Sequence, residues 1–289
     1  MHPDDWHLTH DLDAFLDRAG DFLASRPAMH TVLLTVTENL RSRGVHTYGE
    51  EAPVFGTLEP DGADGEVAAV FLRTPPYWIS LTPLTEVQAD ALAARLASAG
   101  HRLPGVSAER GTADAFVAAW KRRTGAEAGL WKAQRLYRLE ELTVPEPVPD
   151  GAPRIAGATD RAHLMKWCEE FAESIGERNL QDSGALADAR IARGGATFWE
   201  TPDGTPVSLA AVTPEVAGQV RVTTVYTPAE LRGRGYAGAV TAEVSRAVLA
   251  SGTREILLFT DLANPTSNGL YQRIGYRPVA DFAVYEFED

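Results

Sequence analysis

The chain has 289 residues, 44% hydrophobic and 23% charged, which is the composition of a globular protein with room for one large domain or two ordinary ones. Its formal net charge of −13 at pH 7 argues against nucleic acid as a partner. That charge would suit a cationic amine substrate, and solubility alone explains it equally well. No apolar run approaches the length of a membrane span, and the acidic start is unlike a signal peptide. We therefore expect a cytoplasmic protein without a membrane partner.

Cysteine and histidine usage argues against a disulfide-bonded protein and against a metal-binding protein. The single cysteine, Cys168, cannot form an internal disulfide, and its place beside Trp167 in a predicted helix is typical of an inert core thiol. The seven histidines show no metal-ligand spacing. His7 and His10 lie on what we interpret as a frayed approach to the first helix. We therefore predict no metal site.

The first half of the chain predicts helices, a hairpin, a strand and further helices. Thr9 is a plausible N-cap for the first helix, Gly44 ends the second, and Asp61-Gly62 belongs to a hairpin signal. Thr82-Pro83 ends a strand, because proline cannot donate to a ladder. The predicted elements are helices 11–25 and 29–43, strands 54–58, 66–73 and 77–81, helices 85–98 and 112–123, and a strand 134–139.

The second half repeats this order after a proline-rich linker, residues 144–153. Thr159 is expected to cap its first helix, and Thr227-Pro228 ends its third strand as Thr82-Pro83 does in the first half. The predicted elements are strand 154–156, a helix after Thr159, a helix around 183–192, strands 196–200, 207–212 and 220–226, a helix to about 251, strand 255–259, helix 266–274 and strand 283–287. We predict two tandem copies of one α+β fold with a mixed sheet, as domains 1–143 and 154–289.

A glycine-rich turn follows strand 220–226 and opens a helix. The first backbone N–H groups of a helix have no intrahelical partner, and the helix dipole places partial positive charge there. Gly233 and Gly235 allow φ > 0 and remove the Cβ atoms that would keep a diphosphate away. Arg232 and Arg234 can add charge-assisted contacts. The turn therefore predicts a phosphate site.

The spacing Gly233-x-Gly235-x-x-Gly238 also matches the dinucleotide fingerprint, and Asp261 lies near the distance expected for a ribose-binding acid. Two features weigh against this NAD-binding alternative. The match lies close to the end of the sequence, which leaves too few strands for a doubly wound sheet. A loop containing Pro228 and Glu230 also separates the strand from the turn.

The turn resembles the acyl-coenzyme A signature of the GNAT superfamily of N-acetyltransferases, Arg/Gln-x-x-Gly-x-Gly/Ala. A second block of the superfamily is similar to Asn264-Pro-Thr-Ser-Asn-Gly-Leu-Tyr271 together with Ile274-Gly-Tyr276. The resemblance covers roughly residues 154–289. It implies acetyl-CoA as the donor, a primary amine of a small molecule or peptide as the acceptor, and direct attack in a ternary complex.

The resemblance also assigns roles to residues. The end of the strand would hold the pantetheine arm, and a backbone N–H of Val225 or Tyr226 would face the thioester oxygen. Tyr271 would be the general acid, because a phenol with a pKa of about 10 is protonated at neutral pH. Asn264 reads as an N-cap that also lies near the coenzyme, and Ser267 is a weaker candidate. The predicted coenzyme contacts are Val225, Tyr226, Thr227, Arg232, Gly233, Arg234, Gly235, Tyr236, Ala237, Gly238, Asn264, Ser267 and Tyr271.

The general base departs from a common pattern of the superfamily. Many relatives carry a glutamate on the strand before the coenzyme loop, where this chain has Arg221, Thr223 and Thr224. Glu173 or Glu177 from the preceding helix could serve directly or through water, and solvent would suffice for an amine that binds neutral. A solvated helix face explains each glutamate taken singly.

The first half lacks this chemistry. After Pro83 it has Leu84-Thr85-Glu86-Val87, without glycine or arginine, and Trp120 and Lys121 fall near the place of the tyrosine. We therefore expect the first domain not to bind coenzyme A, and to wall an acceptor cleft or act structurally. A non-catalytic acyl-CoA-binding module remains the alternative for the chain.

Overall fold

The computed structural model describes residues 5–59, 66–176 and 182–288, and its contacts divide the chain into two compact units. Unit 1 comprises Met1–Leu136, Asp261–Ala263 and Ala280–Asp289; unit 2 comprises Tyr137–Thr260 and Asn264–Val279. The predicted division by chain order placed 154–289 in one domain. In the structure, the last segment, Ala280–Asp289, groups with unit 1.

Unit 1 takes most of its elements from the first half of the chain. In chain order these are β1 (Trp6–Thr9), α1 (Leu12–Ala24), α2 (Thr31–Arg43), β2 (Val54–Leu58), β3 (Ala69–Arg73), β4 (Ile79–Leu81), α3 (Glu86–Ser98), β5 (Gly105–Glu109), α4 (Arg110–Thr124) and most of β6 (Glu127–Leu139).

Two predictions for this unit were wrong, one strand was missed, and one prediction lies outside the described residues. The approach to the first helix is the strand β1, which pairs with β2, and the N-cap is Asp11, whose side chain accepts hydrogen bonds from Asp13 N and Ala14 N. Strand β5 was not predicted, because its sequence GVSAE has little β-branched or aromatic character. The hairpin turn expected at residues 61–65 lies outside the described part of the chain.

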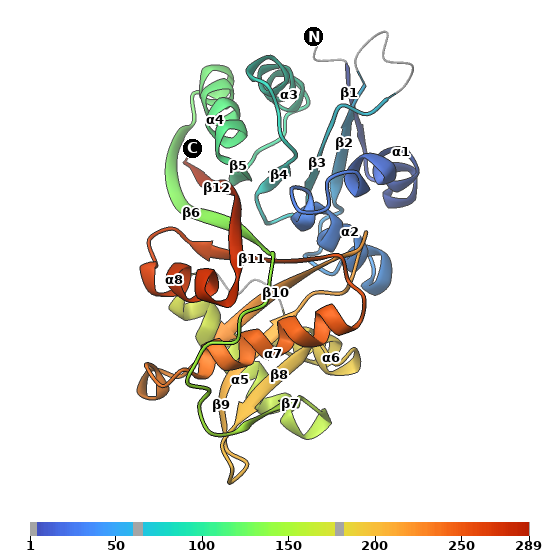
Figure 1. Cartoon of the computed structure of the whole chain (residues 1–289). Coiled ribbons are helices and arrows are strands. Elements are labelled where there is room, and N and C mark those ends of the chain that lie inside the picture. The colour runs from blue at the N-terminus through green and yellow to red at the C-terminus, as the bar shows by residue number, and fades with distance from the viewer. Residues whose placement is uncertain (1–4, 60–65, 177–181, 289) are drawn as a thin grey trace. The chain divides into compact units, whose positions relative to one another are not determined.

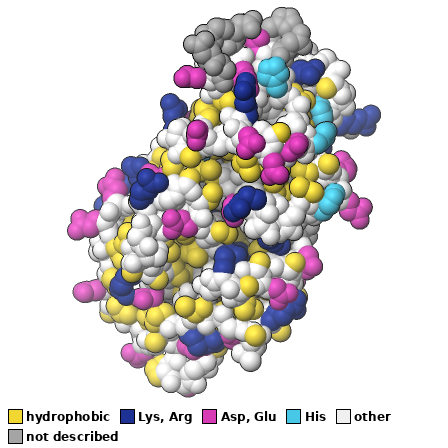
Figure 2. All heavy atoms as spheres, turned by 90° about the vertical axis from the view of Figure 1, so that its right-hand side faces the viewer, with side chains coloured by type: hydrophobic (Ala, Val, Ile, Leu, Met, Phe, Trp, Pro, Cys, Tyr) yellow, Lys and Arg dark blue, Asp and Glu magenta, His cyan; other side chains and the backbone are white. Residues whose placement is uncertain are grey.

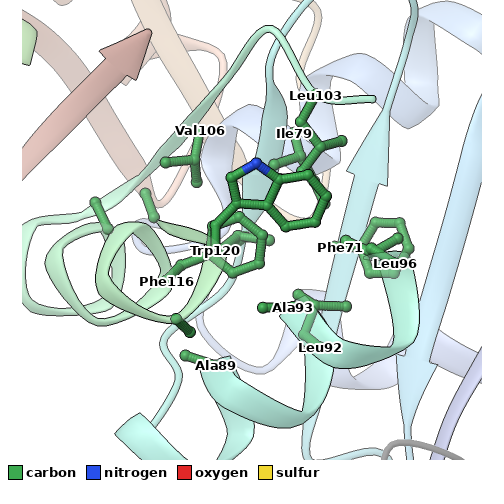
Figure 3. Close-up of a cluster of buried hydrophobic side chains, with 14 of the residues drawn as sticks. Phe71, Ile79, Ala89, Leu92, Ala93, Leu96, Leu103, Val106, Phe116 and Trp120 are labelled. Atoms are coloured by element: carbon green, nitrogen blue, oxygen red, sulfur yellow. The ribbon is translucent and has the colours of Figure 1, made fainter. Parts of the chain in front are cut away.

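The sheet of unit 1 is antiparallel from β1 to β4, and then β4 pairs in parallel with β5. The end of the last strand, β12, pairs antiparallel with β5. Helices α3 and α4 cover one face, where Phe116, Trp120 and Phe71 belong to a buried cluster (Figure 3). On the other face, Phe15 of α1 stacks on Phe55 of β2 with ring centroids 4.8 Å apart. Both faces of the sheet are therefore buried.

Unit 2 contains the glycine-rich turn. Its elements are β7 (Ala152–Ile155), the short 3-10 helix η2 (Ala158–Asp160), α5 (Arg161–Ser174), α6 (Ser183–Ala192), β8 (Ala196–Glu200), β9 (Pro206–Val212), β10 (Gln219–Tyr226), η3 (Ala229–Leu231), α7 (Tyr236–Ala250), β11 (Glu255–Asp261), α8 (Pro265–Ile274) and the start of β12 (Tyr276–Glu288). Because Asp160 and Gly157 shape the turn at η2, α5 begins at Arg161 rather than at a cap on Thr159.

The sheet of unit 2 is antiparallel from β7 to β10, and β10 then pairs in parallel with β11. Helix α7 packs over β8, β9 and β10, as Figure 1 shows, and with α8 it buries Val222, Ile256 and Leu258. Helices α5 and α6 cover the opposite face through a cluster that includes Trp167 and Phe198. In β10, Val222 belongs to the cluster beneath α7, and Tyr226 belongs to the cluster beneath α5 and α6.

The two halves of the chain repeat one element order, as predicted. The same order runs from β1 to β6 and again from β7 to β12: a strand, two helices, three antiparallel strands, a helix, a parallel strand, a helix and a strand. The mixed α/β fold class is confirmed. A doubly wound sheet is excluded, since the described strands β7 to β10 of unit 2 pair antiparallel.

Candidate functional site

Strand β10 contains a β-bulge near its end. Its register with β9 pairs Thr223 with Ala211 and then Tyr226 with Leu209, so two residues, Thr224 and Val225, oppose a single residue of β9. Thr224 has φ 37°, in the left-handed region that a β-branched residue rarely adopts. The strained backbone immediately precedes Val225 and Tyr226, one of whose N–H groups is predicted to face the thioester oxygen.

The bulge coincides with the end of the parallel pairing. Among the residues that the structure describes, β10 and β11 pair from Gln219 with Glu255 to Val222 with Leu258, although both strands continue further. The two strands therefore separate at the bulge and form a fork. A strand edge released in this way offers N–H and C=O groups to an extended ligand.

The glycine-rich turn adopts the backbone conformation predicted from its glycines. Gly233 has φ 78° and Gly235 has φ 86°, and nothing lies within 4 Å of the position that a Cβ would take at Gly233. Gly235 is the N-cap of α7, and no side chain caps the helix. The first N–H groups of α7 are thus left for another partner.

The flanking arginines shape the turn itself. Arg232 Nε donates to the carbonyl oxygen of Thr227 at 3.0 Å, and Arg234 Nη2 donates to the carbonyl oxygen of Glu230 at 3.2 Å. Thr227 is held from its other side by Ser208, whose hydroxyl lies 2.8 Å from Thr227 Oγ1. Through Arg232 the turn is attached directly to the end of β10.

Gly238 serves helix packing. A Cβ at this position would lie 3.2 Å from Leu270 Cδ1 and 3.4 Å from Pro145 Cγ, so the bare backbone lets α7 approach α8 and the linker closely. Pro149 of the linker lies beside Gly235. Tyr236 and Ala237 begin α7 and are half-buried. The coenzyme contacts assigned to these residues remain predictions.

Helix α8 positions the second block of the sequence. Asn264 is its N-cap, with Oδ1 accepting from Ser267 N at 3.0 Å, as predicted. Tyr271 is 7% exposed and packs edge-on against Tyr276. Burial raises the pKa of the Tyr271 hydroxyl well above its usual value of about 10, so the hydroxyl keeps its proton. Tyr271 can therefore donate a hydrogen bond, and its role as general acid stays a prediction.

The carboxylate that reaches the fork strand is one that the sequence did not single out. Tyr226 Oη donates to Glu170 Oε2 at 2.9 Å, which joins α5 to the end of β10. Burial and this hydrogen bond raise the pKa of Tyr226 to about 12. Glu173 is exposed at the end of α5, and Glu177 lies outside the described residues. The i, i+3 spacing of Glu170 and Glu173 was the available signal, but it could not say which of them faces the sheet.

The helix starts of unit 1 differ from the uncapped start of α7. The start of α3 carries a complete capping box between Thr85 and Gln88, and Glu109 accepts from Gly111 N and Thr112 N at the start of α4. A cavity of about 770 Å³ lies at these helix starts, lined by residues that include Glu86, Glu109 and Asp114. Its carboxylates and occupied amides are unsuited to a diphosphate.

Trp120, near the place of the tyrosine in unit 1, is a core residue. It is 3% exposed, and its ring stacks on Phe116 (Figure 3) with centroids 6.0 Å apart. The ring of Phe287 stacks on Trp120 at the same centroid distance of 6.0 Å. Lys121 pairs with Glu127. Trp120 therefore serves the core, and its indole has no hydroxyl that could protonate a thiolate as Tyr271 is predicted to do.

The described residues contain no group of three or more His, Cys, Asp or Glu side chains that could hold a metal ion. Within the same residues, no helix combines the length and apolar composition needed to cross a bilayer.

On the face in Figure 2, described basic side chains are interspersed with acidic ones and form no continuous basic surface.

Comparison with known proteins identifies both the motif region and the fold. The family model of FR47-like protein matches residues 208–284, which include β10, α7, β11 and α8. No curated protein sequence matches the chain.

Solved structures match almost the whole chain. A GCN5-related N-acetyltransferase from Sphaerobacter thermophilus is 17% identical with a TM-score of 0.59, covering 99% of this chain and 96% of its own. An acetyltransferase from the GNAT family of Colwellia psychrerythraea is 11% identical with a TM-score of 0.60, covering 98% of each chain. A tandem GNAT protein from the clavulanic acid biosynthesis pathway is 12% identical with a TM-score of 0.58, also covering 98% of each. At 11–17% identity these structures show the fold, which is the one that the sequence resemblance predicted: that of a tandem GNAT protein.

Proposed function

We propose that this chain, which has the GNAT fold in tandem, is an N-acetyltransferase whose unit 2 transfers an acetyl group from acetyl-CoA to a primary amine. The observation that carries the proposal is the fork of β10 and β11, with its bulge at Thr224, next to the uncapped start of α7. The fork suits a thioester and its pantetheine arm, and the helix start suits a diphosphate.

The reaction needs few catalytic groups, because a thioester is already activated. The amine nitrogen attacks the carbonyl carbon in a ternary complex, and the negative charge that develops on the oxygen is met by a backbone N–H of Val225 or Tyr226. The C–S bond then breaks, and the leaving thiolate takes a proton from Tyr271. The acceptor nitrogen must lose a proton as it attacks.

Glu170 is the candidate base that the geometry favours. Its carboxylate is bonded to Tyr226 on the fork strand, and its side chain is 35% exposed, so solvent and an acceptor can reach it. Glu173 remains the candidate predicted from sequence, on the same helix. A carboxylate at either place would receive the proton directly or through water.

The experiment is a screen of primary amines with acetyl-CoA, read out by release of free thiol. Turnover with at least one amine supports the proposal. Binding of acetyl-CoA without turnover across small amines and peptides would favour the non-catalytic acyl-CoA-binding module. Thermal shifts with acetyl-CoA and with NAD are measured in parallel, and stabilisation by NAD alone would refute both.

A further inference from the structure

A buried arginine lies behind the bulge of β10. Arg190 of α6 is 6% exposed; its Nη2 donates to Thr224 Oγ1 at 2.7 Å and its Nη1 contacts Cys168 Sγ of α5 at 2.8 Å. Its Nε has no hydrogen-bond partner. The side chain therefore joins both helices of this layer to the residue with the strained backbone.

Among the described residues, no carboxylate compensates this charge. Asp188 of the same helix pairs with Arg161, Glu170 binds Tyr226, and Asp182 caps α6. Burial is the largest cause that lowers the pKa of Arg190 and raises that of Cys168, and it outweighs the opposite effect that each of these two groups has on the pKa of the other. A buried and unpaired guanidinium is costly to keep, and this calls for a reason.

We propose that Arg190 is a positioning residue for acyl transfer, which fixes the bulge through Thr224 and supplies positive potential where the thioester oxygen becomes negative. The hydroxyl of Thr224 holds its backbone at φ 37°, and this conformation aims the following N–H groups. The uncompensated charge favours the transition state over the neutral thioester. The inference rests on the proposed function.

The matched pair of variants is Arg190→Met and Arg161→Met. Arg161 also joins α5 to α6, through its ion pair with Asp188, but at the surface. For R190M we expect kcat to fall by about 30-fold with an unchanged KM for acetyl-CoA. The reason is that the positive charge of Arg190 stabilises the negative oxygen of the transition state and not the bound thioester. Tm should stay the same or rise, since a buried unpaired charge is replaced by an apolar side chain. For R161M we expect no change in kcat.

Two further variants test the route through Thr224. Thr224→Val should lower kcat by about tenfold, and the R190M/T224V double variant should be little worse than R190M, since coupled residues are not additive. Arg190→Lys should keep part of the activity and covers the case in which R190M fails to fold. Equal kcat in R190M and R161M, or full additivity with T224V, would overturn the inference.

Hydrogen exchange separates this inference from the proposed function. In R190M the amides of the bulge, residues 224–227, should exchange about tenfold faster than in R161M, whether or not the enzyme turns over. If the wild-type chain acetylates no amine yet the bulge loosens in R190M, the proposed function fails, and what stands is that Arg190 fixes the bulge. If the exchange rates of R190M and R161M are equal, the positioning role fails.

Discussion

The helix that follows the fork strand begins differently in the two units. In unit 2, α7 starts from Gly235 in a left-handed conformation and has no side-chain cap. In unit 1, α3 starts from Thr85, which accepts from Gln88 N while the Gln88 side chain accepts from Thr85 N. A side chain of the protein itself thus satisfies an amide in unit 1 that unit 2 leaves for a ligand.

The strands that precede these two helices, β4 in unit 1 and β10 in unit 2, also differ in how completely they are paired. In unit 1 the segment after β4 is locked onto β3, because Thr82 N and Oγ1 both donate to the carbonyl oxygen of Val70. In unit 2 the corresponding strand bulges at Thr224. One fold therefore supports a local structure that is stable by itself and another that is strained and open. This difference is what the proposed function requires, because a coenzyme site in unit 2 needs strand and helix groups that are not already paired within the protein.

The largest effect on catalysis is expected from Tyr271 in α8, the last helix of unit 2, with Trp120 in α4, the last helix of unit 1, as its counterpart. Tyr271→Phe should lower kcat by about 100-fold or more, because the leaving thiolate loses its proton donor, while the Kd for acetyl-CoA changes little. Thiol release and calorimetry measure the two quantities. Trp120→Phe in unit 1 is the control: it should keep kcat and lose about 1–3 kcal/mol of unfolding free energy through the cavity that it leaves. A Tyr271→Phe enzyme with wild-type kcat would remove Tyr271 from the mechanism.

The open helix start is tested by two glycines with nearly the same backbone. Gly235 has φ 86° at the start of α7 and Gly252 has φ 89° after its end. Alanine at either position should destabilise the fold by about 1–2 kcal/mol, because a Cβ disfavours this conformation. Gly235→Ala should in addition weaken acetyl-CoA binding by about tenfold or more, since the turn distorts and a methyl group enters the phosphate site. Equal affinities of the two variants would show that the coenzyme does not use this turn.

The third prediction concerns Glu170, the carboxylate at the fork of unit 2. Glu170→Gln should lower kcat by about tenfold or more, and by a larger factor than Glu173→Gln, if the bond to Tyr226 marks the base. It should also move the pKa of Tyr226 from about 12 toward the usual value, since the hydrogen-bonded charge disappears. The absorbance of tyrosinate reports the second change.

The sign of the pH dependence follows from the same tyrosine. Its folded pKa lies above the unfolded value of about 10, so its contribution to stability is complete below that pH and is lost as the pH rises toward 12. Urea unfolding at pH 9 and 11 should show a smaller loss of stability in Glu170→Gln than in wild type. A larger loss would contradict the assignment.

Much of this structure could be predicted from short stretches of neighbouring residues. Glycines and prolines predicted the turn at Gly233 and Gly235, the cap at Asn264 and the repeated strand ends, because these depend on a few neighbouring residues. Strand β5 and the bulge at Thr224 could not be predicted, since both depend on pairing with distant strands and Thr224 adopts its φ against its own preference.

The site residues show the same limit. The burial of Arg190 and the choice between Glu170 and Glu173 depend on how α5 and α6 dock onto the sheet, which no local pattern encodes. The last strand, β12, is a similar case: a strand was predicted at residues 283–287, whereas β12 begins at Tyr276, and the pairing of its end with β5 depends on residues far apart in the chain.

The smallest expected effect comes from the closed helix start of unit 1. Thr85→Ala removes the capping box of α3 and should cost about 1 kcal/mol of unfolding free energy, because the Gln88 amide loses its partner. Denaturant unfolding measures it. Neither the affinity for acetyl-CoA nor kcat should change, because the carboxylates of Glu86 and Glu109 still repel a diphosphate there. A second acetyl-CoA bound per chain after this substitution would mean that the capping box alone closes unit 1, and that the repulsion by its carboxylates has little effect.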